Sequence, residues 1–155
     1  MDWIRGFWGS ESATEDESKI MAEMSAIQGA EAEVVGLNFQ TAIDAHMKWR
    51  ARLEAVLHGV SSEKLEAATV AKNDQCVLGK WLYGQGKEHS HLGSFSELEQ
   101  THTHFHKSAA EILHLAQTGR KGEATRLLAG DYRTTSVRIG GLLARLHREA
   151  KQKPS

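Results

Sequence analysis

The spacing of apolar residues along the chain predicts helices from Ser18 almost to the C-terminal end. Within this region apolar side chains recur every three or four residues, which places them on one face of an α-helix. The one proline is Pro154, so no internal position carries the residue that most strongly interrupts a helix. We find no strand-length alternation of apolar and polar residues. The pattern therefore predicts an all-α protein.

The first helical section covers residues 18–58. It opens with a narrow apolar stripe of the coiled-coil type, formed by Ile20, Met24 and Ile27. Such a stripe needs a surface to cover it, either in a second copy of the chain or in the rest of its own bundle. Gly36 weakens the helical pattern, so we expect one long helix or two helices joined near this glycine.

A turn at residues 59–63 and a short helical or irregular stretch lead to a helix that begins around Cys76. Asn73 and Asp74 are the candidate N-caps of this helix, because their side-chain oxygens can accept hydrogen bonds from free backbone N–H groups. Gly84 is expected to end it.

The clearest helix of the chain begins after Ser94, which forms a capping-box pattern with Glu97 ahead of an apolar run. Gly119 is expected to end this helix. A short helix then stops at Gly130, and a last helix covers residues 131–151.

These elements predict an antiparallel four-helix bundle with short extra helices and an N-terminal helical arm. We expect residues 1–17 to be a flexible segment, residues 18–36 a helical extension and residues 37–151 the bundle itself. The flexible segment contains an apolar cluster that is either a frayed end or a short docking segment for a partner or a membrane surface: Trp3, Ile4, Phe7 and Trp8.

Composition and length indicate one globular domain. The chain has 155 residues, of which 40% are hydrophobic and 25% charged. Its single cysteine excludes an internal disulfide and is compatible with a reducing compartment, so we expect a cytoplasmic protein. The sequence predicts no transmembrane segment, because no apolar run reaches about 18 residues. The N-terminal residues also lack the pattern of a signal peptide.

Charge is distributed unevenly along the chain. Residues 1–33 carry eight acidic residues against two basic ones, and residues 120–155 carry nine basic residues against three acidic ones. The two ends could pair within a dimer or with a partner, or they could be solvated helix faces. The basic residues lack interleaved aromatic platforms, so we expect no nucleic-acid binding.

Among the nine histidines, His102 and His106 are separated by four residues on the clearest helix. This spacing places both imidazoles on one helix face, which the flanking apolar residues turn inward. The two rings could share a metal ion, or each could bond a carbonyl or carboxylate on a neighbouring helix. His104 should be exposed, and the remaining histidines outside the inward faces are expected on the surface or in loops: His58, His89, His91, His114 and His147.

Cys76 and His46 complete a candidate set of zinc ligands. Cys76 is expected in the first turn of its helix, where free N–H groups favour a thiolate. His46 lies on the inward stripe of the first helical section. Thiolate and imidazole are the ligands that zinc prefers, so His46, Cys76, His102 and His106 could close a tetrahedral site.

The segment Cys76-Val77-Leu78-Gly79-Lys80-Trp81-Leu82-Tyr83-Gly84 resembles the signature of the chemoreceptor zinc-binding (CZB) domain family. The upstream segment HMKWRARL, which begins at His46, and the downstream segment HTHFH, which contains His102 and His106, resemble the family as well. The resemblance covers about residues 37–150. It implies a four-helix bundle, a zinc ion held by three histidines and one cysteine, and a regulatory role.

The resemblance also implies partners, since members of this family usually form the end of chemoreceptors or diguanylate cyclases. We therefore expect a zinc-binding regulatory or sensory protein that acts on a chemotaxis or cyclic-di-GMP signalling partner, and a homodimer. The alternatives are an interaction module with structural zinc, a zinc buffer and a metal-dependent enzyme. Catalysis is disfavoured, because four protein ligands leave no open position and no acid follows a ligand as in H-E-x-x-H.

Three residues are assigned supporting roles around the zinc. Asp44 and Asp74 are candidate acceptors that would orient an imidazole, and Trp81 is expected to pack under the site. Cys76 is also a candidate redox switch, because an oxidised sulfur binds zinc poorly and its release would free the start of its helix. The resemblance agrees with this hypothesis, since members of the family are thought to sense zinc and hypochlorous acid.

Overall fold

The computed structural model describes residues 15–152, which are helical over most of their length. The elements in chain order are α2 (Glu15–Ser25), a 3-10 helix (Gly29–Ala32), β1 (Glu33–Val34), β2 (Leu37–Asn38), α3 (Phe39–Leu57), α4 (Ala67–Val70), α5 (Val77–Tyr83), a second 3-10 helix (Gln85–His89), α6 (Phe95–Gln117), α7 (Lys121–Leu127), a π-helical turn (Leu128–Tyr132) and α8 (Arg133–Lys151). The all-α prediction is confirmed. The apolar cluster predicted around Trp3 lies outside the described residues.

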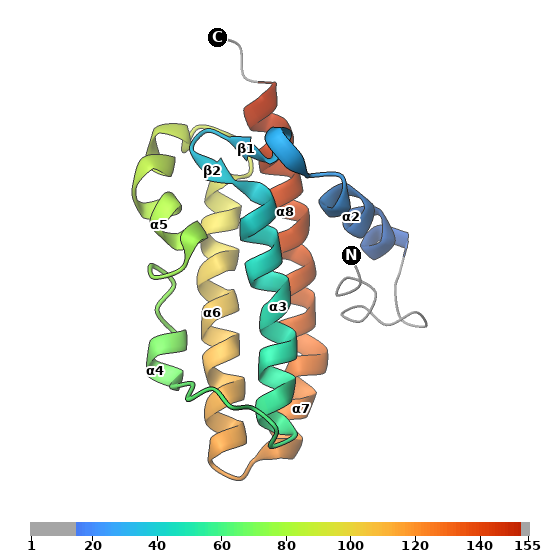
Figure 1. Cartoon of the computed structure of the whole chain (residues 1–155), viewed down its shortest axis with the longest axis vertical. Helices are drawn as coiled ribbons and strands as arrows, with labels where there is room; N and C mark the ends of the chain where they lie inside the picture. The colour runs from blue at the N-terminus through green and yellow to red at the C-terminus, as the bar shows by residue number, and fades with distance from the viewer. Residues whose placement is uncertain (1–14, 153–155) are drawn as a thin grey trace.

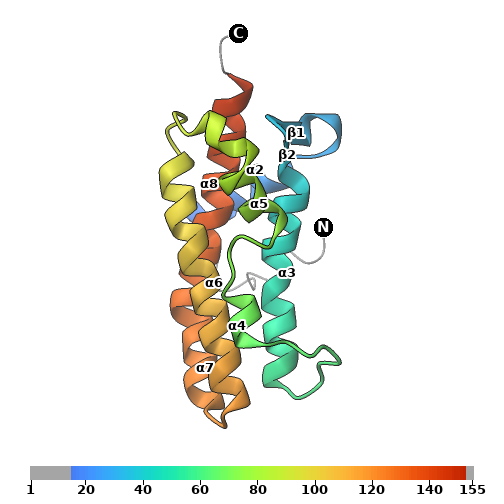
Figure 2. The ribbon, with the colours of Figure 1, turned by 90° about the vertical axis from the view of Figure 1, so that its left-hand side faces the viewer.

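Three long helical columns form the bundle. Helices α3 and α6 lie beside a third column in which α7, the π-helical turn and α8 follow one another without a break (Figure 1). The expected stop at Gly130 is wrong, because the chain widens there into a π-helical turn and continues. The fourth side of the bundle is formed by the short helices α4 and α5 and the loop between them (Figure 2).

The predicted interruption near Gly36 is a small hairpin. β1 pairs with β2 in antiparallel register, with Val34 opposite Leu37. Val35 and Gly36 form the turn with positive φ angles of 48° and 82°. Positive φ at both central positions is the geometry of a type I′ hairpin turn. Two-residue strands are too short to show alternation, which explains why the sequence pattern did not predict them.

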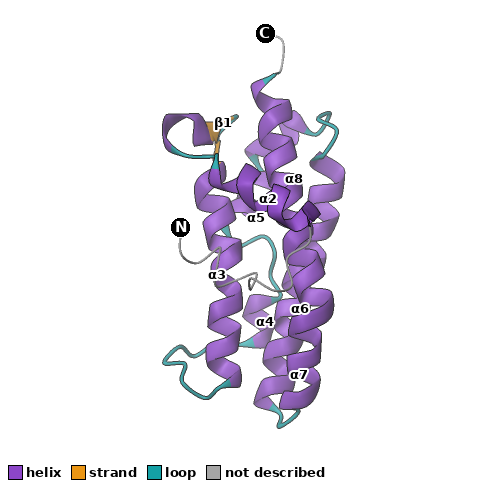
Figure 3. Ribbon diagram, turned by 90° about the vertical axis from the view of Figure 1, so that its right-hand side faces the viewer, coloured by secondary structure: helices purple, strands orange, loops and turns teal. Residues whose placement is uncertain are grey.

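The N-terminal helix α2 folds back on its own bundle and crosses α8 (Figure 3). Met24 and Ile27 of the predicted stripe are buried, with 1% and 5% of their surface exposed. Two adjacent glycines on α8 make room for this contact, since a Cβ at Gly140 would lie 2.5 Å from the Met24 sulfur. The stripe is therefore covered within one chain. It gives no support to the predicted homodimer, which stays a prediction.

The acidic N-terminal part and the basic C-terminal part of the sequence form ion pairs with each other within one chain. Acidic residues of the N-terminal part pair with basic residues of α8: Glu17 with Arg133, Glu23 with Arg148 and Glu31 with Lys151. The partners are partly exposed, and pairs of this kind contribute little stability each. In the described part of the chain, no helix combines the length and apolar character needed to cross a membrane.

Replacing Met24 with alanine should lower the free energy of unfolding by about 2–5 kcal/mol, because a fully buried side chain is lost and α2 loses its anchor on α8. Chemical denaturation of the purified protein measures this change. Lys19→Ala is the matched control on the exposed side of the same helix and should change stability by less than about 0.5 kcal/mol. Equal stability of the Met24 variant and the wild type would contradict the observed packing of α2.

Candidate metal centre

Four side chains that are far apart in the sequence meet between α3, α5 and α6. His46 projects from the middle of α3, and His102 and His106 project from successive turns of α6. Cys76 is the N-cap of α5, where its sulfur accepts a hydrogen bond from the N–H of Gly79 at 3.3 Å. The expected caps Asn73 and Asp74 lie just before this position. The structure therefore places Cys76 one position earlier than the expected first turn.

The four potential ligand atoms form a compact group in which all lie within 4.8 Å of one another. The sulfur of Cys76 is 3.2 Å from Nε2 of His102, 3.7 Å from Nε2 of His106 and 4.0 Å from Nε2 of His46. The Nε2 atoms of His102 and His106 are 3.1 Å apart. The structure thus brings together all four residues that the sequence predicted as zinc ligands.

Two of the three imidazoles are oriented by backbone carbonyls. Nδ1 of His46 donates to the carbonyl of Ala42 at 2.8 Å, and Nδ1 of His106 donates to the carbonyl of Val70 at 2.9 Å. A proton on Nδ1 leaves the lone pair of Nε2 free to bind a cation, and this arrangement is common around metal ions. Nδ1 of His102 is buried without a hydrogen-bond partner.

The distances fit a zinc ion. Zn–N bonds of about 2.05 Å and a Zn–S bond of about 2.3 Å at tetrahedral angles separate two nitrogens by about 3.3 Å and a nitrogen from the sulfur by about 3.6 Å. The observed 3.1 Å between Nε2 of His102 and Nε2 of His106 is close to the first value, and the 3.2–4.0 Å from the three Nε2 atoms to the sulfur span the second. A set of three nitrogens and one sulfur binds zinc in preference to harder cations such as magnesium.

Burial sets the protonation of these groups when no cation is bound. It lowers the pKa of His46 to about 4 and that of His102 to about 2, and it also lowers the pKa of His106. Burial raises the pKa of the Cys76 thiol, against a smaller opposite effect of the hydrogen bond from Gly79. The N–H group at the helix start acts in the expected direction, but burial outweighs it, so a cation is needed to displace the thiol proton.

These low pKa values predict that the zinc-free protein loses stability as the pH falls. The unfolded chain gains protons on its histidines below about pH 6.5, whereas folded His46 and His102 stay neutral. Between pH 6.5 and pH 5.5 each of the two histidines should cost about 1 kcal/mol of stability. Denaturation of chelator-treated protein at the two pH values measures this loss. His102→Leu should reduce this loss of stability. His58→Ala, at an exposed position, should not reduce it. An equal loss of stability between the two pH values in both variants would contradict the assignment.

Of the supporting residues, Trp81 is buried, and its packing under the site stays a prediction. It is 5% exposed, contacts Phe95 and donates from its indole Nε1 to the carbonyl of Val35 at 2.9 Å. Asp74 accepts a hydrogen bond from Gln75. Oδ1 of Asp44 is buried without a hydrogen-bond partner. The imidazoles of His46 and His106 are instead oriented by backbone carbonyls, whose position no sequence motif predicts.

Of the other histidines, three are exposed as predicted, namely His58, His91 and His114, whereas His89 is half-buried and stacks on Trp81. His104 is exposed, as expected, and its Nε2 lies 2.8 Å from Oδ2 of Asp131. His147, expected on the surface, is buried on α8 and bonds the carbonyl of Glu31 at 2.7 Å. Its ring also meets Phe39 edge-on, so the core accepts this histidine because its polar atom is paired.

The sequence did not predict how the segment before Cys76 is held against the bundle. The side-chain amide of Asn73 donates to the hydroxyls of Tyr83 and Thr103 at 2.8 and 2.7 Å, which ties this segment to α5 and α6. A Cβ at Gly79 would lie 1.8 Å from the carbonyl oxygen of Asn73. Gly79 therefore permits the close approach of this loop to α5.

The fold and the buried donor set define a metal-binding helical bundle. Residues 46–113 match the family model of the chemoreceptor zinc-binding domain. The match covers less than half of the chain, which is similar to that family over these residues; together with the four-ligand group it indicates Zn²⁺ as the cofactor. The match begins at His46 and contains all four candidate ligands. No curated protein and no solved structure matches the chain significantly.

Proposed function

We propose that the chain is a zinc-binding regulatory module in which His46, Cys76, His102 and His106 hold one Zn²⁺. The observation that carries this proposal is the convergence of three Nε2 atoms and one sulfur within 4.8 Å of one another. Because the ligands come from α3, α6 and the N-cap of α5, bound zinc would join three separate segments. A regulatory role fits the family better than catalysis, since four protein ligands leave no open coordination position.

The test is the metal content of the full chain, purified without added metal and measured by plasma mass spectrometry. We expect one zinc per chain and little iron. Removal of the zinc with a chelator should lower the thermal unfolding temperature while most of the helix signal remains, because the apolar core persists. Recovery of the protein with iron, or with no metal even after incubation with excess zinc, would contradict the proposal.

We further propose that Cys76 acts as the switch of this module. Cys76 is half-buried, whereas the three histidines are at most 4% exposed, so an oxidant reaches the sulfur most easily. In the reaction with hydrogen peroxide, the thiolate sulfur attacks one oxygen, the O–O bond breaks, hydroxide leaves and a sulfenic acid forms. The sulfenic acid binds zinc less well than the thiolate does, and it caps α5 differently. The start of α5 would therefore be released.

Treatment of the zinc-loaded protein with stoichiometric peroxide or hypochlorous acid tests this switch. We expect loss of the free thiol, release of zinc and a small loss of helix signal, all reversed by a reductant. If Cys76 stays reduced under these conditions, the zinc is structural or the protein is a zinc buffer.

The similarity to the family supports a class of partner. We propose that the module acts on a chemoreceptor or a diguanylate cyclase and functions as a homodimer. Co-purification from the native cell with and without chelator tests the first point, and light scattering at micromolar concentration tests the second. Recovery of the same partners by Cys76→Ser and wild type, regardless of zinc, would contradict zinc-dependent regulation.

A further inference from the structure

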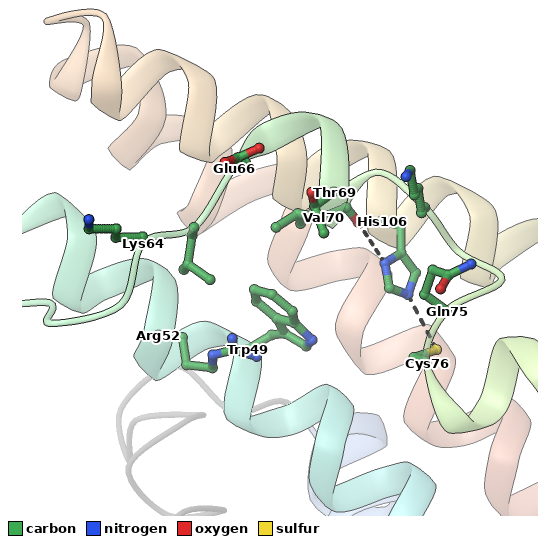
Figure 4. A pocket seen from close by; sticks show the side chains of 11 residues that line it. Trp49, Arg52, Lys64, Glu66, Thr69, Val70, Gln75, Cys76 and His106 are labelled. Atoms are coloured by element: carbon green, nitrogen blue, oxygen red, sulfur yellow. Dashed lines mark hydrogen bonds between the residues drawn. The ribbon is translucent and has the colours of Figure 1, made fainter.

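A pocket of about 400 Å³ lies directly beside the candidate metal centre. Trp49 and Arg52 of α3 form one wall, and the chain from Lys64 to Gln75, which includes α4, forms the other (Figure 4). Cys76 and His106 line one end of it (Figure 4). The volume falls in the range of about 300–1,000 Å³ that is typical of small-molecule sites.

The lining of this pocket carries more positive than negative charge. Arg52, Lys64 and Lys72 line it, against one acid, Glu66. Arg52 is fixed in place, since its guanidinium lies 3.8 Å from the centre of the Trp49 ring and 2.6 Å from a carboxylate oxygen of Glu63. The two lysines contribute the remaining positive charge around the opening, which favours an anionic occupant.

The same pocket has an apolar side. The Trp49 ring, Leu65 and Val70 line it together with the charged residues. Apolar walls with a few converging charges are the usual composition of a site for small organic molecules. We propose that this pocket binds a small organic anion with an aromatic or apolar body, whose negative charge is attracted by Lys64 and Lys72 and whose body packs on Trp49.

The position of the pocket gives such a ligand a role. Cys76 and His106 line the pocket, whereas His46 and His102 do not. The bound anion would therefore cover the open edge of the centre and shield the Cys76 sulfur from reagents. Only this role as a cover of the metal centre rests on the proposed function. Binding of the anion itself needs no metal ion.

Nuclear magnetic resonance titration of the zinc-loaded full chain with phenylacetate tests the binding. Phenylacetamide is neutral and phenethylamine is cationic, and both have an aromatic body similar to that of phenylacetate. We expect phenylacetate to shift the indole resonance of Trp49 and not that of Trp81, and to bind at least about threefold more tightly than either analogue. Trp49→Phe identifies the resonance. Equal binding of the three compounds, or no shift at Trp49, would overturn the proposal.

Charge variants locate the site. Lys64→Gln and Lys72→Gln should each weaken phenylacetate binding about threefold, whereas Lys107→Gln, at an exposed position of α6 outside the pocket, should leave it unchanged. An equal effect of all three variants would overturn the assignment to this pocket.

A second measurement uses the chelator-treated full chain. Saturating phenylacetate should slow the alkylation of Cys76 by neutral iodoacetamide at least fivefold in the wild type and much less in the Lys64→Gln, Lys72→Gln double variant. Equal slowing in both proteins would overturn the proposal. A protein that binds no zinc but still shows this protection of Cys76 by phenylacetate would refute the proposed function and leave the anion site standing.

Discussion

Replacing His102 with alanine should lower the affinity for zinc by more than about 100-fold, since loss of residues that merely support a ligand already costs 10–100-fold. His102 is completely buried, and its Nε2 lies close to both the sulfur of Cys76 and Nε2 of His106. A water molecule that replaced the imidazole would be a weaker and poorly held ligand. Competition with a chromophoric chelator measures the affinity of each variant.

His104→Ala is the matched control for this experiment. His104 lies two residues further along α6, but it is exposed and pairs with Asp131. Its removal should leave zinc affinity within about twofold of the wild type, because a loss of surface contacts costs little. Equal losses of zinc in the two variants would show that the ligand face of α6 has been assigned incorrectly.

The ligand face of α6 could be predicted because helical periodicity alone decides it. Residues 102 and 106 are one turn apart, and the apolar neighbours of both fix the inward direction. His46 and Cys76 required more than periodicity, because nothing local indicates that α3 and the start of α5 meet α6 at the same height. The resemblance to a known family supplied that information, and the geometry of the four atoms agrees with it.

Predictions from local preferences failed where a distant partner decides the structure. Ser94 and Glu97 have the spacing of a capping box, yet Ser94 makes no capping bond. Its N–H and hydroxyl instead donate to the carboxylate of Glu149, which is 55 residues away. Glu97 pairs with Arg138. The start of α6 is thus held by α8, and a sequence pattern that considers only neighbouring residues cannot contain that contact.

The π-helical turn shows the same limitation. Glycine commonly ends a helix, so Gly130 was a reasonable end point. In the structure the hydroxyl of Thr135 donates to the carbonyl of Asp131 at 2.8 Å, and the carboxylate of Asp131 accepts from Ser108 on α6. The phenol ring of Tyr132 packs on Phe105, which also contacts His46. The contacts of Asp131 and Tyr132 with α6 stabilise the widened turn and outweigh the preference of a single glycine.

Gly79→Ala should disrupt the metal centre without changing any ligand. The added Cβ would lie 1.8 Å from the carbonyl oxygen of Asn73 and 3.0 Å from Cα of Asp74. Both are backbone atoms that cannot move aside as a flexible side chain does, so the segment that leads to Cys76 must shift. We expect the free energy of unfolding to fall by about 3 kcal/mol. Zinc affinity should fall as well, because the sulfur is displaced from the three imidazoles.

Denaturation and zinc competition on the same preparations measure both effects of Gly79→Ala. Gly122→Ala is the matched control, since a Cβ at this position of α7 would meet only Nη1 of Arg126, at 3.9 Å. There alanine favours the helix by up to about 1 kcal/mol, so stability should be equal or higher and zinc affinity unchanged. Unaltered zinc affinity in a folded Gly79 variant would mean that the sulfur of Cys76 contributes little to binding, and the site would then depend on the three histidines alone.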